Sequence, residues 1–212
     1  MTAPRMDMKM FNLAIIALAV VFTLALGGRV VWAHLRLPPV VENWRQAVAG
    51  GTPLRDTTGA VRMVVFSDFE CPHCARAHPL LERVADRYAG RLTIVLRHLP
   101  LHAHSFAAAV AAECAASQGR FDALARALYR QQDSIGVRSW MSYARDAAIP
   151  DTAAFASCVG HGRTRARVDS DVALARAVGA AGTPTVLLGG RLFKGVPDER
   201  RLDQLIEGVL GR

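Results

Sequence analysis

Two cysteines separated by two residues are the side chains in this sequence most capable of chemistry. Cys71 and Cys74 enclose Pro72 and His73 in the segment CPHC. Such a pair can cycle between a dithiol and a disulfide, supply half of a zinc site, or attach haem. Haem attachment requires a histidine directly after the second cysteine, and Ala75 occupies that position.

A zinc site is also disfavoured, because the other ligands are poorly placed. A closed zinc site takes four ligands, usually two cysteine pairs or one pair with histidines. His73 and His78 lie near the pair, but Cys114 and Cys158 stand alone and far apart in the sequence. We therefore predict no metal and no other cofactor.

A redox role for the pair follows from the elements predicted around it. The apolar run at residues 63–66 predicts a buried strand, and Pro72 suits the first position of a helix. Cys71 would then precede the helix, where free backbone N–H groups and the helix dipole stabilise a thiolate and lower its pKa. His73 is expected to assist if its ring lies near that sulfur. Cys74, one turn later and better buried, would act as the resolving thiol.

The remaining chain predicts the elements that position this pair. Apolar segments at residues 61–69 and 91–99 predict two parallel strands joined by a helix at about 72–88, a right-handed βαβ unit. Residues 103–178 predict helices, and TPTVLLGGRLFKG predicts a hairpin before a terminal amphipathic helix. This order predicts an α/β, thioredoxin-like fold with a helical insertion between its βαβ and ββα halves.

With these elements, the chain resembles the DsbA-like thiol:disulfide oxidoreductases of the bacterial cell envelope over about residues 44–210. The resemblance rests on the segments FSDFECPHC and GTPT. It implies that Cys71 is the exposed nucleophile and that Cys74 resolves the mixed disulfide. It also implies that Pro184 is a cis-proline and that the backbone of Thr183 pairs with substrate as a strand would.

The N-terminus carries a continuous apolar run at residues 11–28, preceded by Arg5 and Lys9. About eighteen apolar residues are just enough to cross a bilayer core, and basic residues before them keep that end in the cytoplasm. We expect residues 1–33 to be an inner-membrane anchor, with the catalytic domain on the periplasmic side, or a cleaved signal segment. Either route exports the rest of the chain to an oxidising compartment.

Domain organisation and charge follow from the same pass along the chain. We expect a tether and lead-in at residues 34–60 and a thioredoxin-like domain at 61–212, with the insertion at about 103–178. The net charge of +8 comes from scattered arginines and not from a basic block, so we predict a solvated surface and no nucleic-acid binding.

Two further cysteines, Cys114 and Cys158, lie on apolar faces of the predicted insertion helices. In an oxidising compartment two remaining thiols are expected to pair, so we predict a structural disulfide between them. The alternative is two small buried side chains without a bond.

Several ionisable residues lie near the CPHC segment. Asp68 and Glu70 flank it and are expected to be solvated surface residues. Two histidines that follow a strand end, His102 and His104, would be able to line the site. The histidines expected to be structural or exposed are His78, His98, His102 and His104.

Together these features predict an oxidase that passes a Cys71–Cys74 disulfide to reduced exported proteins, because a stabilised thiolate makes the disulfide a good oxidant. The resemblance implies reoxidation by a membrane quinone-linked thiol oxidase, and we expect a monomer. One alternative is a disulfide isomerase or reductase, although residues 34–60 are too few for the dimerisation domain of the family's isomerases. The other is a non-catalytic chaperone or metal-binding protein of the same fold.

Overall fold

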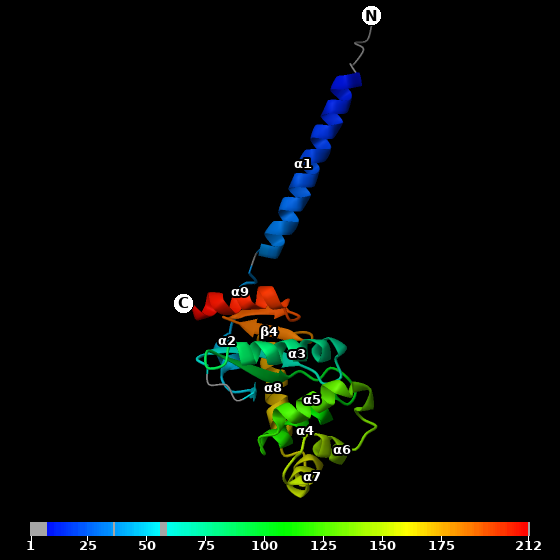
Figure 1. Ribbon diagram of the computed structural model, residues 1–212, viewed down its shortest axis with the longest axis vertical. Helices are drawn as coiled ribbons and strands as arrows, with labels where there is room; N and C mark the ends of the chain where they lie inside the picture. Colours follow the sequence, from blue (N-terminus) through cyan, green and yellow to red (C-terminus); the bar gives the residue numbers. More distant parts are fainter. Residues whose placement is uncertain (1–7, 36, 56–58, 212) are drawn as a thin grey trace, which may run out of the picture. The chain divides into compact units, whose positions relative to one another are not determined.

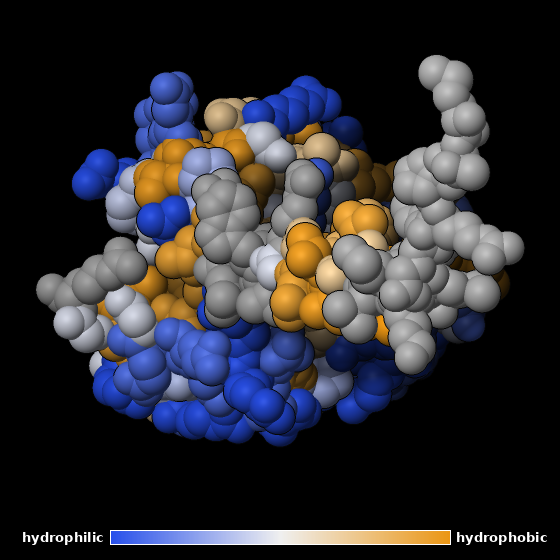
Figure 2. Space-filling view, turned by 90° about the horizontal axis from the view of Figure 1, so that it is seen from above, coloured by the Kyte–Doolittle hydropathy of each residue, from blue (hydrophilic) through white to orange (hydrophobic). Residues whose placement is uncertain are grey.

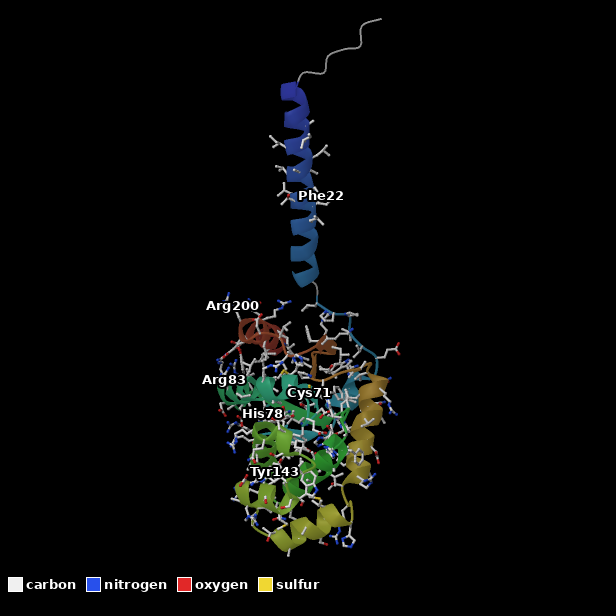
Figure 3. The ribbon with its side chains drawn as sticks, turned by 90° about the vertical axis from the view of Figure 1, so that its right-hand side faces the viewer. Phe22, Cys71, His78, Arg83, Tyr143 and Arg200 are labelled. Atoms are coloured by element: carbon white, nitrogen blue, oxygen red, sulfur yellow. A yellow bond between two sulfur atoms is a disulfide. The ribbon has the colours of Figure 1, made fainter. Side chains whose placement is uncertain are left out.

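The computed structural model describes residues 8–35, 37–55 and 59–211. The chain divides into two compact units, Met1–Pro38 and Pro39–Arg212. The first contains helix α1, Met8–Leu35, from which Phe22 projects with 65% of its surface exposed (Figure 3). Within the described ranges, no helix combines the length and the apolar character needed to cross a membrane. The predicted transmembrane anchor at residues 11–28 is therefore not supported.

The second unit is built on a five-stranded sheet with the order β1-β3-β2-β4-β5. Strands β2 and β3 are parallel, whereas the other neighbouring pairs are antiparallel. The predicted parallel βαβ unit is thus confirmed. The strands are β1 Thr52–Leu54, β2 Val61–Ser67, β3 Leu92–His98, β4 Thr185–Leu188 and β5 Arg191–Lys194.

Helices cover the sheet because its central strands bury both faces. Every residue of β3 is buried, the pattern of a strand packed on two sides. Helix α3, Pro72–Arg87, joins β2 to β3, and α9, Glu199–Leu210, ends the domain. Arg87 of α3 forms surface ion pairs with Glu199 and Asp203 of α9. Seen from above, hydrophilic side chains gather along one edge of the molecule (Figure 2).

The predicted insertion is a block of helices between β3 and β4, and four of them, α4 to α7, cluster together in the second unit (Figure 1). Their packing gives the thioredoxin-like α/β fold a second, largely helical layer beside the redox pair. The elements are α4 Ser105–Ala116, α5 Phe121–Arg130, the 3₁₀-helix η1 Gln132–Ser134, α6 Trp140–Asp146, α7 Thr152–Gly160 and α8 Arg165–Ala177.

The lead-in contains more structure than the predicted tether at residues 34–60. Helix α2, Trp44–Val48, packs on the sheet through the buried Ala47. Residues 52–54 add strand β1, which pairs antiparallel with β3. Three residues including Pro53 are too short a segment to show strand periodicity, and an edge strand tolerates the missing proline N–H.

Cys114 of α4 and Cys158 of α7 form a disulfide with a Cα–Cα distance of 5.9 Å. The two residues are 44 positions apart in the sequence, so the bond closes a long loop. A cross-link of this span restricts the unfolded chain and stabilises the fold by about 4 kcal/mol in the chain-entropy description.

We therefore expect the Cys114→Ala/Cys158→Ala double variant to lose about 4 kcal/mol of unfolding free energy, measured by urea denaturation. A Cys71→Ser/Cys74→Ser variant is the control, since it keeps the long-range bond. Unchanged stability in the Cys114→Ala/Cys158→Ala variant would contradict a stabilising role.

Candidate redox site

Cys71 and Cys74 lie at the junction between strand β2 and helix α3. Cys71 is the N-cap residue of α3 with an extended backbone, and Pro72 stands at the start of the helix. The Cys71 carbonyl accepts the N–H groups of Cys74 at 3.0 Å and of Ala75 at 3.1 Å. Both cysteines are free thiols. This arrangement places the two sulfurs one helical turn apart, as the sequence predicts.

The Cys71 thiol faces the loop before β4 and is covered by it. Its sulfur donates a hydrogen bond to the Thr183 carbonyl at 3.3 Å, and the Thr183–Pro184 peptide bond is cis. The expectation of an exposed nucleophile is wrong for this state, because Cys71 is only 5% exposed against 2% for Cys74. The Cys71 side chain makes no capping hydrogen bond to α3 in this reduced form.

Cys74 lies in an environment that keeps its proton. Burial raises the pKa of Cys74 to about 12, although hydrogen bonds with the Ser67 side chain, the Asp68 backbone and the Thr183 side chain act to lower it. A thiol with this pKa stays protonated at neutral pH, as a resolving cysteine should until it reacts.

His73 is exposed and points along α3. Its Nδ1 accepts a hydrogen bond from Arg76 Nη2 at 2.9 Å. In the described part of the chain, no hydrogen bond joins His73 to Cys71. No direct contact therefore supports the prediction that His73 stabilises the Cys71 thiolate.

A groove of about 500 Å³ runs beside the pair. It lies between the first turns of α3 and the Thr183–Pro184 loop, and it continues past β5. The groove adjoins the redox pair through His73, the residue after Pro72, and through Thr183, whose carbonyl accepts the Cys71 thiol. Its main lining residues are His73, Arg76, Leu80, Pro184, Val196 and Pro197.

Asp68 and Glu70 are anchors of the site and not solvated surface residues, which corrects the prediction for both. Asp68 is 2% exposed and accepts hydrogen bonds from Leu101 N at 2.6 Å and His102 Nδ1 at 2.7 Å. Its other oxygen accepts from Glu70 N at 2.8 Å and from the Ser105 hydroxyl. A buried carboxylate requires such compensation, so these bonds fix the loop before Cys71.

Glu70 reaches the same turn. Its carboxylate accepts the His104 backbone N–H at 2.7 Å and lies 3.2 Å from His104 Nδ1. Burial alone would raise the pKa of Glu70, but hydrogen bonds from Ser105 and His104 outweigh it and lower the pKa. His102 and His104 thus border the site through these acids, with their rings about half exposed.

The insertion contributes side chains that no sequence pattern near them predicts. Gln132 Nε2 donates to the carbonyls of Phe69 at 2.6 Å and Cys71 at 3.0 Å. Tyr129 of α5 shares a buried hydrogen bond of 2.7 Å with Ser67 Oγ. Both contacts depend on tertiary packing across more than sixty positions of sequence.

His78 follows Cys74 by one turn on α3 and is buried against Tyr129, with ring centroids 4.7 Å apart. Neither ring nitrogen finds a hydrogen-bond partner among the described residues. Burial lowers the pKa of His78 to about 4, although the charge of Glu82, 3.8 Å away, acts in the opposite direction. The imidazole is therefore neutral at physiological pH.

No group of three or more histidine, cysteine or acidic side chains in the described ranges could hold a metal ion.

Residues 56–208 match the protein family described as Thioredoxin. The chain belongs to the thioredoxin family. Its fold is that of DsbA-like proteins: the thiol-disulfide exchange protein alpha-DsbA2 from Wolbachia pipientis has a TM-score of 0.69 at 19% identity, over 78% of this chain and 91% of that one. A periplasmic thioredoxin-like protein from Salmonella enterica serovar Typhimurium has a TM-score of 0.65 at 22% identity, over 81% and 99%.

A thioredoxin-like oxidoreductase from Silicibacter pomeroyi DSS-3 has a TM-score of 0.62 at 25% identity, over 73% of this chain and 88% of that one. Among curated relatives, the Na(+)/H(+) antiporter NhaA of Herminiimonas arsenicoxydans is 32% identical over 145 residues, 68% of this chain but 23% of the antiporter. This thioredoxin-family chain spans about a quarter of the length of the curated relatives it matches. No antiport activity is therefore inferred for this chain.

The buried His78 makes stability depend on pH. Above its ordinary pKa of 6.5 the imidazole is neutral in the folded and unfolded chains alike. As the pH falls from 6.5 towards 4, the unfolded chain takes up a proton that the folded chain refuses, so stability is lost over this window. The loss by pH 4.5 is about 2–3 kcal/mol.

We expect His78→Phe, which keeps a ring against Tyr129, to remove this share of the loss between pH 7.5 and 4.5, measured by urea unfolding at both values. His161→Gln, at an exposed histidine, is the matched control and should leave the loss as in the parent protein. An equal loss in His78→Phe would show that the imidazole does not titrate as described.

Proposed function

We propose that this chain is a thiol:disulfide oxidoreductase that oxidises exported proteins through the Cys71–Cys74 couple. The observation that carries the proposal is the position of Cys71 at the start of α3, opposite the Thr183 carbonyl and beside a peptide-sized groove. Such an exchange needs a sulfur that a substrate thiolate can attack, a second thiol close to that sulfur, and a surface that can bind an extended chain.

The reaction begins with the oxidised pair. A substrate thiolate attacks Cys71 Sγ, the Cys71–Cys74 bond breaks, and its electron pair passes to Cys74 Sγ. A second substrate thiolate then attacks the substrate sulfur of the mixed disulfide, and the Cys71 sulfur leaves with the electron pair of the mixed-disulfide bond. The substrate is oxidised to a disulfide, the couple is reduced to a dithiol, and the two substrate protons end on the two cysteines by way of solvent.

The direction of exchange is supported by the unequal settings of the two sulfurs. Cys71 stands at the N-terminus of a 16-residue helix whose first turn has no acidic side chain, so the helix dipole favours a thiolate there. A favoured thiolate stabilises the reduced enzyme and makes its disulfide the better oxidant. His73, at the edge of the groove, belongs to the surface that meets the substrate.

The location in the cell envelope is supported by the Cys114–Cys158 disulfide, since structural disulfides persist in oxidising compartments. Substrates would then be reduced exported proteins, held by the Thr183 backbone and the groove. A membrane quinone-linked thiol oxidase would restore the Cys71–Cys74 disulfide.

The reduction potential of the couple tests the direction. We expect a value more oxidising than about −200 mV, against about −270 mV for thioredoxin, measured by equilibration with glutathione. A potential close to that of thioredoxin would contradict the oxidase and favour the reductase or isomerase.

Single-cysteine variants test the roles of the two sulfurs. Both Cys71→Ser and Cys74→Ser should lose oxidation of a reduced protein substrate, because neither variant can form the Cys71–Cys74 disulfide. Cys74→Ser should in addition accumulate mixed disulfides between Cys71 and disulfide-containing substrates, detectable on non-reducing gels, because Cys74 is no longer there to attack them. Equal trapping by both variants would contradict the assignment of Cys71 as the attacked sulfur.

A further inference from the structure

A regular series of ion pairs joins α3, and the turn that follows it, to α9. Arginines recur at every fourth position on the α3 side, and acidic residues recur at every fourth position of α9. The pairs are Arg83 with Glu199, Arg87 with Glu199 and Asp203, and Arg91 with Glu207. Because the paired residue numbers rise together, the two helices run parallel. We call this set of ion pairs the α3–α9 seam.

Arg76 lies on the same side of α3 as the seam but has no acidic partner. It precedes Arg83 by seven residues, which is two helical turns and a rotation of only about 20°. Helix α9 begins at Glu199, opposite Arg83, so it supplies no residue level with Arg76. Among the described residues, Arg76 forms no ion pair. It faces the groove beside the redox pair instead.

The Arg76 guanidinium is held at the edge of this groove. Its Nη2 donates to His73 Nδ1 at 2.9 Å, and both side chains line the groove. A guanidinium carries five N–H donors in a planar fork, and this bond uses one of them. The remaining donors match the two oxygens of a carboxylate, the group that arginine binds with two parallel hydrogen bonds.

The other lining residues leave this charge uncompensated. Asp198 lines the far side of the groove, but its Oδ1 accepts the Arg201 N–H at 2.9 Å and so caps α9. The first turn of α3 contains no acidic side chain. Leu80 and Val196 are apolar and suit the aliphatic stem of a bound side chain. The α3 side of the groove is therefore complementary to an acidic side chain with a short apolar stem.

The spacing between Cys71 and Arg76 matches the repeat of an extended peptide. Arg76 follows Cys71 by five residues, which is about 7.5 Å along the helix axis. In an extended chain, side chains two residues apart point to the same side and lie about 6.6–6.8 Å apart. A substrate whose cysteine reacts with Cys71 can therefore place the side chain two positions away level with Arg76.

We propose that Arg76 is a specificity-determining residue, and that it binds the carboxylate of an acidic side chain two positions from the substrate cysteine. This inference rests on the proposed exchange at Cys71–Cys74. The preferred substrates are then proteins that carry Asp or Glu beside the thiol to be oxidised. The substrate carboxylate continues the α3–α9 seam by one further ion pair. It also gains a counter-charge that reduces its repulsion of the attacking thiolate.

The test follows the reduction of the oxidised full-length protein by an excess of a single-cysteine peptide, with acid quenching and alkylation of the protein thiols. Three peptides share one sequence and carry Glu, Gln or Lys at both positions two residues from the cysteine. For each protein variant, the rate constant with the Glu peptide is divided by that with the Gln peptide. Comparison of this ratio between variants cancels the intrinsic thiol reactivity of each peptide.

We expect the Glu-over-Gln ratio to fall roughly threefold in Arg76→Gln, the range of a partly exposed ion pair. Arg76→Glu should favour the Lys peptide over the Glu peptide. Arg83→Gln is the matched control, because it removes the same charge from the same helix at a residue already paired with Glu199. Its ratio should equal that of the parental protein.

Two results would overturn the inference. One is an equal ratio in the parental protein and in Arg76→Gln. The other is an equal fall in Arg76→Gln and Arg83→Gln, which would assign the preference to the net positive charge of the chain. A parental protein that none of the three peptides reduces would instead refute the proposed function, so the two claims fail separately.

Discussion

The buried carboxylate of Asp68 is the constraint on which the redox site depends. Asp68 lies three residues before Cys71, is 2% exposed and receives four hydrogen bonds. Three of the donors follow β3: Leu101 and His102 in the turn before α4, and Ser105 as the first residue of α4. An anion in this position without its donors would cost several kcal/mol, so the loop and the turn are held together. The backbone that places Cys71 at the start of α3 is fixed in consequence.

The insertion is joined to the sheet at the end of β3, where two consecutive buried side chains point to opposite faces. Arg97 pairs with Asp171 of α8 and donates to the Ala47 carbonyl at 2.7 Å, while His98 lies 2.8 Å from Glu113 of α4. Alternation along a strand sends neighbours to opposite sides. Each face of the sheet thereby holds one helix of the insertion, which fixes the insertion against the end of β3.

Much of this architecture was predictable, and the remainder depends on contacts distant in sequence. The βαβ unit follows from continuous apolar runs, and Pro72 identifies the helix start, because both signals are local. Asp68 looks like a surface residue within SDFE, and its burial depends on donors more than thirty positions later. Tyr129 looks like an ordinary core aromatic of an amphipathic helix. Strand β1 is too short to show periodicity. Helix α1 covers residues 11–28, but no helix of the described residues has the length and apolar character needed to cross a membrane.

Cys71 and Cys74 lie within four consecutive residues, yet their sulfurs have opposite chemical requirements. The fold gives each sulfur a different environment. Cys71 stands at the N-terminus of α3, and its thiol donates a hydrogen bond to the Thr183 carbonyl. Cys74 is buried, which keeps it protonated at rest and makes it a poor leaving group. The helical insertion takes part in the site as well as in the core, because Gln132 Nε2 donates to the carbonyls of Phe69 at 2.6 Å and of Cys71 at 3.0 Å. The backbone that presents the attacked sulfur is therefore held from the insertion side as well as by the sheet.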